Sequence, residues 1–207
     1  MKRNLLLLLA ILIFGAGYAQ TKVMLPEPDK TGGMPLMEAL SKRSTDRNFT
    51  GKALTQQQLS DLLWGAWGIN RADGRRTAPS AVNAQDIDLY VFLPDGAYRY
   101  DAGEHALVLV AKGDFRDGVC TQAFGKTAPV HVVFVSDLTR LRGNDEQQKR
   151  ITAAADSGFI GQNIYLVAAS EGMKSVVYHG GIDRTKVAEL LGLPATSWPV
   201  CGQAVGF

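Results

Sequence analysis

The chain has 207 residues, of which 46% are hydrophobic and 20% are charged, and its formal net charge is +2. This length is enough for one domain with a buried core, and the composition is that of a globular protein rather than a disordered one. The balance of charges excludes a polybasic surface of the kind that binds nucleic acid or an anionic membrane.

The first 19 residues have the features of a secretory signal peptide. Lys2 and Arg3 precede an apolar run, and small residues at positions 17 and 19 suit cleavage after Ala19. The run is shorter than the roughly 20 apolar residues that span a bilayer, so we expect removal and no stable membrane insertion. Cleavage removes two of the 22 basic residues and leaves 20 against 20 acidic ones. We therefore expect an exported, periplasmic protein with a single domain over residues 20–207.

The mature chain starts with an extended segment and two helices. Proline and glycine residues between positions 20 and 33 indicate an extended arm, and a short helix is predicted at 35–40. Thr55 and Gln58 form a capping-box pattern, after which apolar residues recur at helical spacing. This pattern predicts a helix that ends near Trp67.

Strands dominate the middle of the chain. A strand is predicted at 88–93, and the Pro-Asp-Gly turn at 94–96 leads into a second strand at 97–100. A further short strand is predicted near 107–110. The apolar run at 129–136 predicts a buried strand.

The last third of the chain alternates helix and strand. Residues 154–171 are alanine-rich and nearly apolar, which predicts a long helix, ended by Gly172 and buried internally or against a partner subunit. A strand and turn at 174–183, a helix from there to Gly192 and a final strand at 199–207 complete the prediction. Because helices and strands neither alternate strictly nor segregate along the whole chain, the expected class is α+β.

The histidines and cysteines give no pattern of a metal site. His105, His131 and His179 are scattered, and His131 lies in an apolar run where a core histidine is the ordinary interpretation. Cys120 and Cys201 are the two cysteines of the chain. Export would permit a disulfide between them, although isolated cysteines are more often simply buried. We expect no bound metal.

The stretch "RSTDRNF" suggests a phosphate site. Arg43 and Arg47 supply two guanidinium groups four residues apart, and Ser44 and Thr45 supply hydroxyl and backbone donors between them. Such a set suits a doubly charged phosphate, where guanidinium and hydroxyl donors act together. The alternative is a solvated basic turn after a helix, which is common for an isolated match.

The stretch "APSAVNAQD" suggests a surface for a flat ring. Pro79 and Ser80 form a stiff, low-profile backbone, and Asn83 and Gln85 carry both donors and acceptors. The edge of a flavin ring requires such uncharged partners, because a group that ionised there would favour one redox state too strongly. The alternative is an ordinary Pro-Ser turn before a strand, capped by Asn83.

The stretch "HGGID" is the third candidate. Gly180 and Gly181 leave room for a ligand to approach the backbone and expose amide donors to it. A plain turn is the more frequent cause of such a pair, so this signal alone is weak.

Together the three stretches resemble the FMN-dependent nitroreductase family, and within it the branch of SagB-type dehydrogenase-like proteins. The resemblance is carried by "EALSKRSTDRNFTGKALTQQQLSDLLWGAWGINR", "GRRTAPSAVNAQDIDLYVF", "DSGFIGQNIYLVAASEGM" and the closing "QAVGF". These segments span nearly all of the mature chain, and the run from Glu38 to Phe92 is the most specific part.

The resemblance implies a nitroreductase-like sandwich, with a central antiparallel or mixed sheet flanked by helices. It also implies a homodimer that binds FMN at the subunit interface, with the helix from Ala154 in the dimer core. The implied FMN-binding residues are Arg43, Ser44, Thr45 and Arg47 at the phosphate and ribityl end, Pro79, Ser80 and Asn83 at the isoalloxazine ring with Gln85 beside them, and Gly180 and Gly181 near flavin N5.

The chain departs from the family at its end. Many members carry a lysine or arginine beyond the last strand that completes the phosphate site, whereas this sequence ends at Gly206-Phe207. Either the affinity for FMN is lower, or another cation substitutes. Arg71, Arg75 and Arg76 are the candidates.

The implied activity is ping-pong oxidoreduction, in which NAD(P)H reduces the flavin and an electron-poor acceptor such as a nitroaromatic or quinone oxidises it. The flavin supplies the chemistry, so no catalytic side chain is expected. No GxGxxG motif follows a strand, so NAD(P)H would bind over the flavin itself. Because NAD(P)H is scarce outside the cytoplasm, other functions stay open: an exported flavin-binding electron carrier without turnover, a SagB-type azoline dehydrogenase, or a cofactor-free dimeric scaffold.

Overall fold

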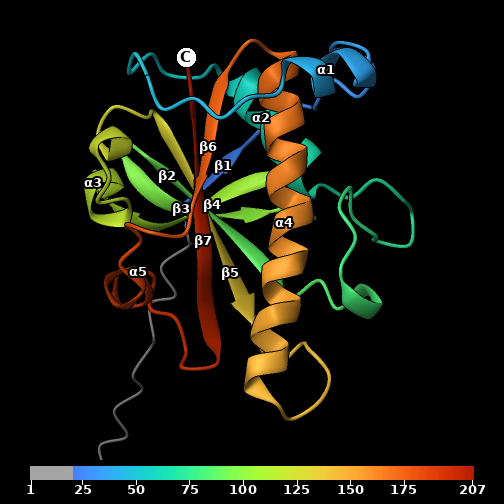
Figure 1. Cartoon of the computed structure of the whole chain (residues 1–207), viewed down its shortest axis with the longest axis vertical. Coiled ribbons are helices and arrows are strands. Elements are labelled where there is room, and N and C mark those ends of the chain that lie inside the picture. The colour runs from blue at the N-terminus through green and yellow to red at the C-terminus, as the bar shows by residue number, and fades with distance from the viewer. Residues whose placement is uncertain (1–20) are drawn as a thin grey trace, which may run out of the picture.

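The computed structural model describes residues 21–207, and the expected signal peptide at 1–19 lies outside that range. The elements in chain order, with η for a short 3₁₀ turn, are β1 (Lys22–Met24), α1 (Leu36–Lys42), α2 (Gln56–Trp67), η1 (Ala81–Asn83), β2 (Ile87–Leu93), β3 (Gly96–Asp101), β4 (Ala106–Lys112), α3 (Arg116–Val119), η2 (Ala123–Gly125), β5 (Val130–Asp137), α4 (Glu146–Ser170), β6 (Lys174–Tyr178), α5 (Arg184–Leu191) and β7 (Ser197–Gly206). Figure 1 shows their arrangement.

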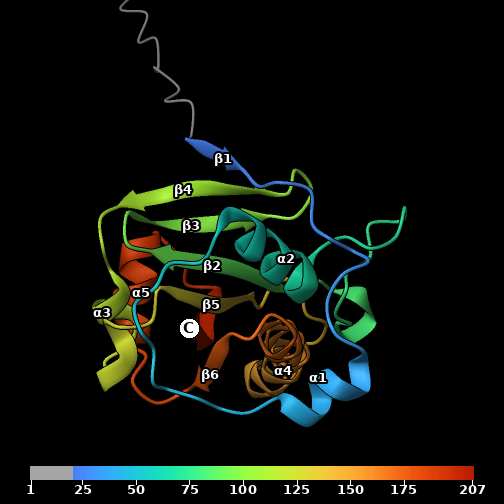
Figure 2. The same cartoon turned by 90° about the horizontal axis from the view of Figure 1, so that it is seen from above.

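The strands form one seven-stranded sheet in the order β1-β4-β3-β2-β5-β7-β6, and every neighbouring pair is antiparallel. Helices α2 and α4 cover one face, and α3 and α5 cover the other (Figure 2). The α+β prediction is confirmed, and the sheet is antiparallel rather than mixed. The predicted extended arm contributes the edge strand β1, which pairs with β4.

Two hydrophobic clusters lie on opposite faces of the sheet. Val132 and Phe134 of β5 pack into the cluster beneath α2 and α4, whereas Val133 and Val135 pack into the cluster beneath α3 and α5. This division follows from strand geometry, because successive side chains point to opposite faces. The central strand is therefore apolar on both faces, as its sequence predicts.

Helix α2 begins where its capping box predicts. The Thr55 hydroxyl accepts a hydrogen bond from the backbone N–H of Gln58, and the Gln58 side chain accepts one from the backbone N–H of Thr55. Leu62, Leu63 and Ala66 are fully buried along one side of the helix. Local capping and apolar spacing therefore agree in this segment.

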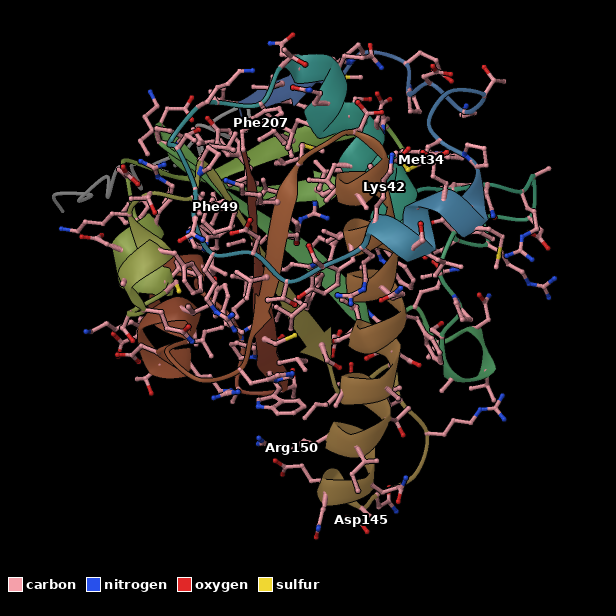
Figure 3. The ribbon with its side chains drawn as sticks, turned by 45° about the horizontal axis from the view of Figure 1, so that its top comes forward. Met34, Lys42, Phe49, Asp145, Arg150 and Phe207 are labelled. Carbon is pink, nitrogen blue, oxygen red and sulfur yellow. The ribbon has the colours of Figure 1, made fainter. Side chains whose placement is uncertain are left out.

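Helix α4 differs from its prediction. It begins at Glu146 rather than at residue 154, because the Asp145 side chain accepts hydrogen bonds from the first free backbone N–H groups of the helix. An ion pair between Glu146 and Arg150 supports the first turns, and Figure 3 marks this lower end at Asp145 and Arg150. The polar opening "EQQKR" has no apolar spacing, so periodicity did not reveal it.

His131 is a core residue, as its surroundings in the sequence indicate. It is fully buried, and its two ring nitrogens lie 3.0 Å from the Tyr178 hydroxyl and 2.9 Å from the Gly125 carbonyl oxygen. Burial lowers the pKa of His131 to about 4, so the ring is neutral near pH 7. Cys120 and Cys201 are buried free thiols.

Between residues 21 and 207, no helix has the length and apolar character needed to cross a bilayer. The same residues contain no cluster of three or more histidine, cysteine, aspartate or glutamate side chains that could hold a metal ion.

Candidate functional site

The basic stretch of residues 43–49 is an extended loop rather than a turn. Figure 3 shows the chain between Lys42 and Phe49 crossing the upper end of α4 and then β6. The backbone N–H of Asp46 donates to the carbonyl oxygen of Ser175, 3.1 Å away, and so ties the loop to the edge of the sheet. We call residues 43–49 the basic loop.

Tyr165 of α4 anchors the basic loop. The guanidinium carbon of Arg43 lies 5.4 Å from the centre of the Tyr165 ring, a cation–π contact. The Tyr165 hydroxyl accepts a hydrogen bond from the backbone N–H of Val177 at 2.9 Å and lies 3.1 Å from the hydroxyl of Thr45. One side chain thus joins the loop, helix α4 and strand β6. The sequence did not indicate this role, because a tyrosine in an apolar helix is ordinarily interpreted as a core residue.

The two arginines of the basic loop have no acidic partner. Among residues 21–207, neither Arg43 nor Arg47 forms an ion pair, whereas Arg75, Arg116, Arg140 and Arg150 do. The hydroxyl of Ser44, between them, is exposed. Because guanidinium groups without a carboxylate partner are ready to bind an anion, the loop has the donors that a phosphate requires.

The three arginines expected as alternative phosphate cations are bonded to other groups. Arg71 donates to the carbonyl oxygen of Arg76, and Arg75 pairs with Asp73. Arg76 itself donates to Gln85. All three arginines therefore stabilise the segment between α2 and the Gln85 side chain.

Two lysines instead flank the end of the chain. Lys174 pairs across β6 and β7 with Gly206 and donates from its ammonium group to the carbonyl oxygen of Asn48, 2.6 Å away. The Lys52 ammonium lies 4.2 Å from the ring centre of Phe207. Both lysines therefore lie beside the basic loop, and no pattern in the sequence indicated them.

A cavity of about 120 Å³ lies on the α4 side of the sheet, and Tyr165, which contacts the basic loop, is part of its lining. Its lining includes Ser157, Gly158, Gly161, Gln162 and Tyr165 of α4, Val177 of β6 and the following His179. The glycines keep the helix surface low at this point. A methyl group added at Gly161 would lie 3.2 Å from the side-chain oxygen of Gln203, so the space depends on glycine there.

Two polar atoms near this cavity have no hydrogen-bond partner among the described residues. They are the Ser157 hydroxyl and the side-chain oxygen of Gln203, and both are buried. A buried polar atom without a partner is unfavourable and is rare in folded proteins. A ligand with donors at its edge would satisfy both.

The Pro-Ser turn, residues 79–85, is strained. Val82, Asn83 and Gln85 have φ values of 48°, 56° and 47°, in the left-handed region that non-glycine residues seldom occupy. The Ser80 hydroxyl accepts a hydrogen bond from the backbone N–H of Gln85 at 2.9 Å. Strain of this kind persists only where surrounding contacts impose it, and it clusters at ligand sites.

Gln85 is a partner of Asn83 rather than a free ligand. Its amide nitrogen donates to the Asn83 side-chain oxygen at 3.3 Å and to the Gly74 carbonyl oxygen at 3.2 Å, and its own oxygen accepts from Arg76 at 2.9 Å. These bonds occupy the Gln85 amide. The exposed Asn83 amide nitrogen donates to no group among residues 21–207, so its N–H groups are available to an acceptor on a ligand.

The two glycines of "HGGID" differ in their surroundings. Gly181 has φ 82°, and a methyl group there would lie 2.8 Å from the Gln122 side chain, so this position requires glycine. The Gly180 carbonyl oxygen accepts from the Gln122 amide at 2.6 Å. A methyl group at Gly180 would meet nothing within 4 Å. Gly180 therefore leaves its backbone open to close approach, as the sequence suggests.

Two of the three stretches come near the cavity beside α4. Tyr165, which anchors the basic loop, and His179, the first residue of "HGGID", both line it. The Pro-Ser turn, green in Figures 1 and 2, lies on the other side of α4. No hydrogen bond or ion pair within residues 21–207 joins Arg43 to Asn83.

Comparison with known proteins identifies the family. The sequence pattern of the Nitroreductase family matches residues 40–207. The chain belongs to the nitroreductase family. A solved structure of a provisionally assigned nitroreductase from Ralstonia eutropha JMP134 is 40% identical, with a TM-score of 0.84 over 92% of this chain and 90% of that chain.

Two further proteins are more distantly similar, one in sequence and one in fold. MJ1384 of Methanocaldococcus jannaschii, whose name is a provisional assignment as a nitroreductase, is 25% identical over 165 residues, 75% of this chain and 82% of that protein. The NADPH:FMN oxidoreductase of Vibrio harveyi, solved in complex with NAD+, is 23% identical, with a TM-score of 0.60 over 83% of this chain and 67% of that chain. The predicted family and fold are confirmed, while the SagB-type branch stays a prediction.

Replacing Tyr165 with phenylalanine tests the anchor of the basic loop. The ring stays beneath Arg43, but the N–H of Val177 and the hydroxyl of Thr45 lose their partner. We expect the free energy of unfolding to fall by about 1–2 kcal/mol and amide hydrogen exchange to rise in residues 43–49. Tyr98→Phe, which removes a hydroxyl bonded to Asp95, is the control and should leave exchange in the loop unchanged. Equal exchange in the two variants would contradict the anchoring role.

Proposed function

We propose that this protein is an exported FMN-dependent oxidoreductase. It transfers hydride from NAD(P)H, through the flavin, to an electron-poor acceptor such as a nitroaromatic or a quinone. The observation that carries the proposal is the pair of arginines without acidic partners, Arg43 and Arg47, beside a glycine-lined cavity in a chain of the nitroreductase family. Export rests on the signal peptide expected at residues 1–19.

The residues present fit a flavin mononucleotide. The guanidinium groups of the basic loop suit the phosphate, with Ser44 and Thr45 as neutral donors. The orphaned oxygens of Ser157 and Gln203 suit the hydrogen-bond donors of a flavin. The small surface formed by Gly158 and Gly161 leaves space for a flat group.

A single chain encloses only part of such a ligand. Pockets for small molecules usually have volumes of roughly 300–1,000 Å³, whereas the cavity beside α4 has about 120 Å³. The Pro-Ser turn lies on the far side of α4 from this cavity. We therefore propose a homodimer, in which the Pro-Ser turn of one copy faces the basic loop and cavity of the other.

Exposed apolar side chains on α4, α1 and the Pro-Ser turn support such an interface. Ile151 and Phe159 of α4 are 56% and 48% exposed, and Leu36 and Met37 of α1 are 62% and 75% exposed. Val82, in the Pro-Ser turn, is 65% exposed. Clustered apolar exposure of this kind marks an interaction surface. Helix α4 is thus apolar on two sides, one facing the sheet and one available to a partner.

In the proposed reaction the role of the protein is to bind the flavin and to orient it. When bound, FMN would supply the redox chemistry of hydride transfer from NAD(P)H to the acceptor, which we propose to be ping-pong. Arg43 and Arg47 would hold its anionic end, Asn83 would donate to the ring edge, and Gly180 would permit close approach. This arrangement requires no acid–base side chain.

The visible spectrum of the purified mature protein tests the function. We expect flavin absorbance, and we expect it to bleach when NADPH is added anaerobically and to return when a quinone follows. Absorbance that persists with NADPH would favour an exported electron carrier over the oxidoreductase. A colourless protein that does not bind added FMN would contradict both.

Substitutions in the basic loop test the phosphate site. Each charge-assisted hydrogen bond contributes roughly 1.5–3 kcal/mol, so Arg43→Ala or Arg47→Ala should weaken FMN binding by about tenfold or more. Fluorescence titration with FMN measures the change, and titration with riboflavin, which lacks the phosphate, should show a much smaller one. Arg142→Ala, at an exposed position before α4, is the charge-matched control. FMN affinity equal to that of the control would exclude the site.

A charge on the exposed side of α4 tests the dimer. Phe159→Glu would place a carboxylate in an apolar interface, so we expect a monomer in analytical ultracentrifugation and loss of FMN binding. Lys112→Glu, at an exposed position in β4, introduces the same residue away from this surface and should leave the dimer intact. A Phe159→Glu variant that remains dimeric and binds FMN would refute the interface.

A further inference from the structure

Two buried acidic residues lie directly beneath the Pro-Ser turn. Asp86, which follows the turn, is fully buried, and Asp156 of α4 is 2% exposed. Neither belongs to the site residues expected from the sequence. Buried carboxyl groups are rare unless they are paired, because removing a charge from water is unfavourable.

Asp156 holds the start of the turn. Both of its carboxyl oxygens accept the backbone N–H of Ala81, at 3.2 and 3.0 Å. Ala81 is the first residue of η1 and precedes the left-handed residues Val82 and Asn83. The contact joins positions 75 residues apart in the sequence, so it fixes the turn to α4.

Asp86 holds the end of the turn. The Ser136 hydroxyl donates to one carboxyl oxygen of Asp86 at 2.6 Å, and the backbone N–H of Asp137 donates to the Asp86 carbonyl oxygen at 2.8 Å. The other carboxyl oxygen, Oδ1, is buried and receives no hydrogen bond from any donor of the described residues. The carboxyl group within hydrogen-bonding range of Asp86 is that of Asp156.

Two ionised carboxylates can only accept hydrogen bonds, so they repel each other when they meet. A single proton between them converts this repulsion into a hydrogen bond. We propose that Asp86 and Asp156 share one proton, and that this acid–carboxylate pair positions the Pro-Ser turn by holding it in its strained, left-handed conformation. The flavin-facing role of the turn rests on the proposed function, whereas the pair itself does not.

The electrostatic surroundings agree with a protonated Asp86. Burial, followed by the nearby Asp156, raises the pKa of Asp86 from 3.8 to about 6. The charged groups that face it are Asp156 from α4 and Arg140 from the segment after β5. Arg140 does not neutralise Asp86, because its guanidinium group bonds to Asp88 and Asp137.

The sign of the pH dependence follows from this pKa. Because the folded-state pKa of Asp86 lies above the unfolded value, the stabilisation is present at low pH and is lost as the pH rises through about 6. For a shift from 3.8 to about 6, the folding equilibrium constant should fall about tenfold between pH 5 and pH 8 through this group alone.

The test is Asp86→Asn in the mature full-length chain without flavin. The asparagine amide donates to Asp156 at any pH and still accepts from Ser136, so it replaces the shared proton. Urea unfolding at pH 5 and pH 8 gives the ratio of the folding constants of parent and variant. We expect this ratio to fall about tenfold from pH 5 to pH 8. A ratio constant within about twofold would overturn the proposal.

Two further variants make the result specific. In Asp156→Asn the amide oxygen still accepts from Ala81 and the amide nitrogen donates to ionised Asp86, so the same change in ratio is expected. Asp117→Asn, on exposed α3 in an ion pair with Lys126, should leave the ratio independent of pH. A change of the same size in Asp117→Asn would assign the effect to net charge and refute the pair.

Titration with FMN over the same pH range tests the positioning of the turn. We expect the affinity of the parent, relative to that of Asp86→Asn, to fall by up to about tenfold from pH 5 to pH 8. The ionisation of the FMN phosphate affects both proteins equally, so its effect on the affinity is absent from this ratio. A parent that binds no FMN would refute the proposed function while the unfolding ratio still decides the acid pair. Equal pH dependence of FMN affinity in both proteins would refute the positioning role.

Discussion

The packing of helix α4 against the sheet is the contact on which both halves of the site depend. Ile160 and Ile164 are buried on the inner side of α4, and the helix packs against β2, β6 and β7, which fixes it in place. The helix then holds the basic loop through Tyr165 on one side and the Pro-Ser turn through Asp156 on the other. A change that shifted α4 would therefore move the basic loop and the Pro-Ser turn together.

Buried polar atoms without a hydrogen-bond partner indicate where the folded chain could bind a further group. Ser157 Oγ and Gln203 Oε1 lie near the cavity beside α4, where a flavin would supply partners, whereas Asp86 Oδ1 lies beneath the Pro-Ser turn, where a proton would do so. Buried polar atoms need hydrogen-bond partners, but the expected partner differs between these sites. The first two atoms lie near a cavity that a ligand could enter, whereas the third faces another carboxyl group, with which it could share a proton. Together the flavin and the proton would account for three of the four buried side-chain polar atoms that lack a partner among residues 21–207, and the fourth is Thr77 Oγ1.

The division of the site by α4 also explains why one helix has two apolar sides. The inner side is needed to fill the core, and the outer side, with Phe159 and Ile151, is exposed in a single chain. If a second copy covers the outer side, the Pro-Ser turn of one chain approaches the basic loop of the other. The strained turn would then contribute to a ligand site that neither chain completes alone. Such a site is where backbone strain of this kind is usually found.

The sequence by itself determined the features that depend on near neighbours: the capping box of α2, the β2–β3 hairpin, the helix after Asp183 and the arginine and glycine motifs that identified the family. It missed the first turns of α4, because their polar residues have no apolar spacing. Tyr165, Asp86 and Asp156 could not be assigned from the sequence, since their roles arise from contacts between distant segments, such as Ala81 with Asp156. Only the tertiary structure decided these roles, because a buried hydrogen bond or a shared proton depends on which groups the fold removes from water together.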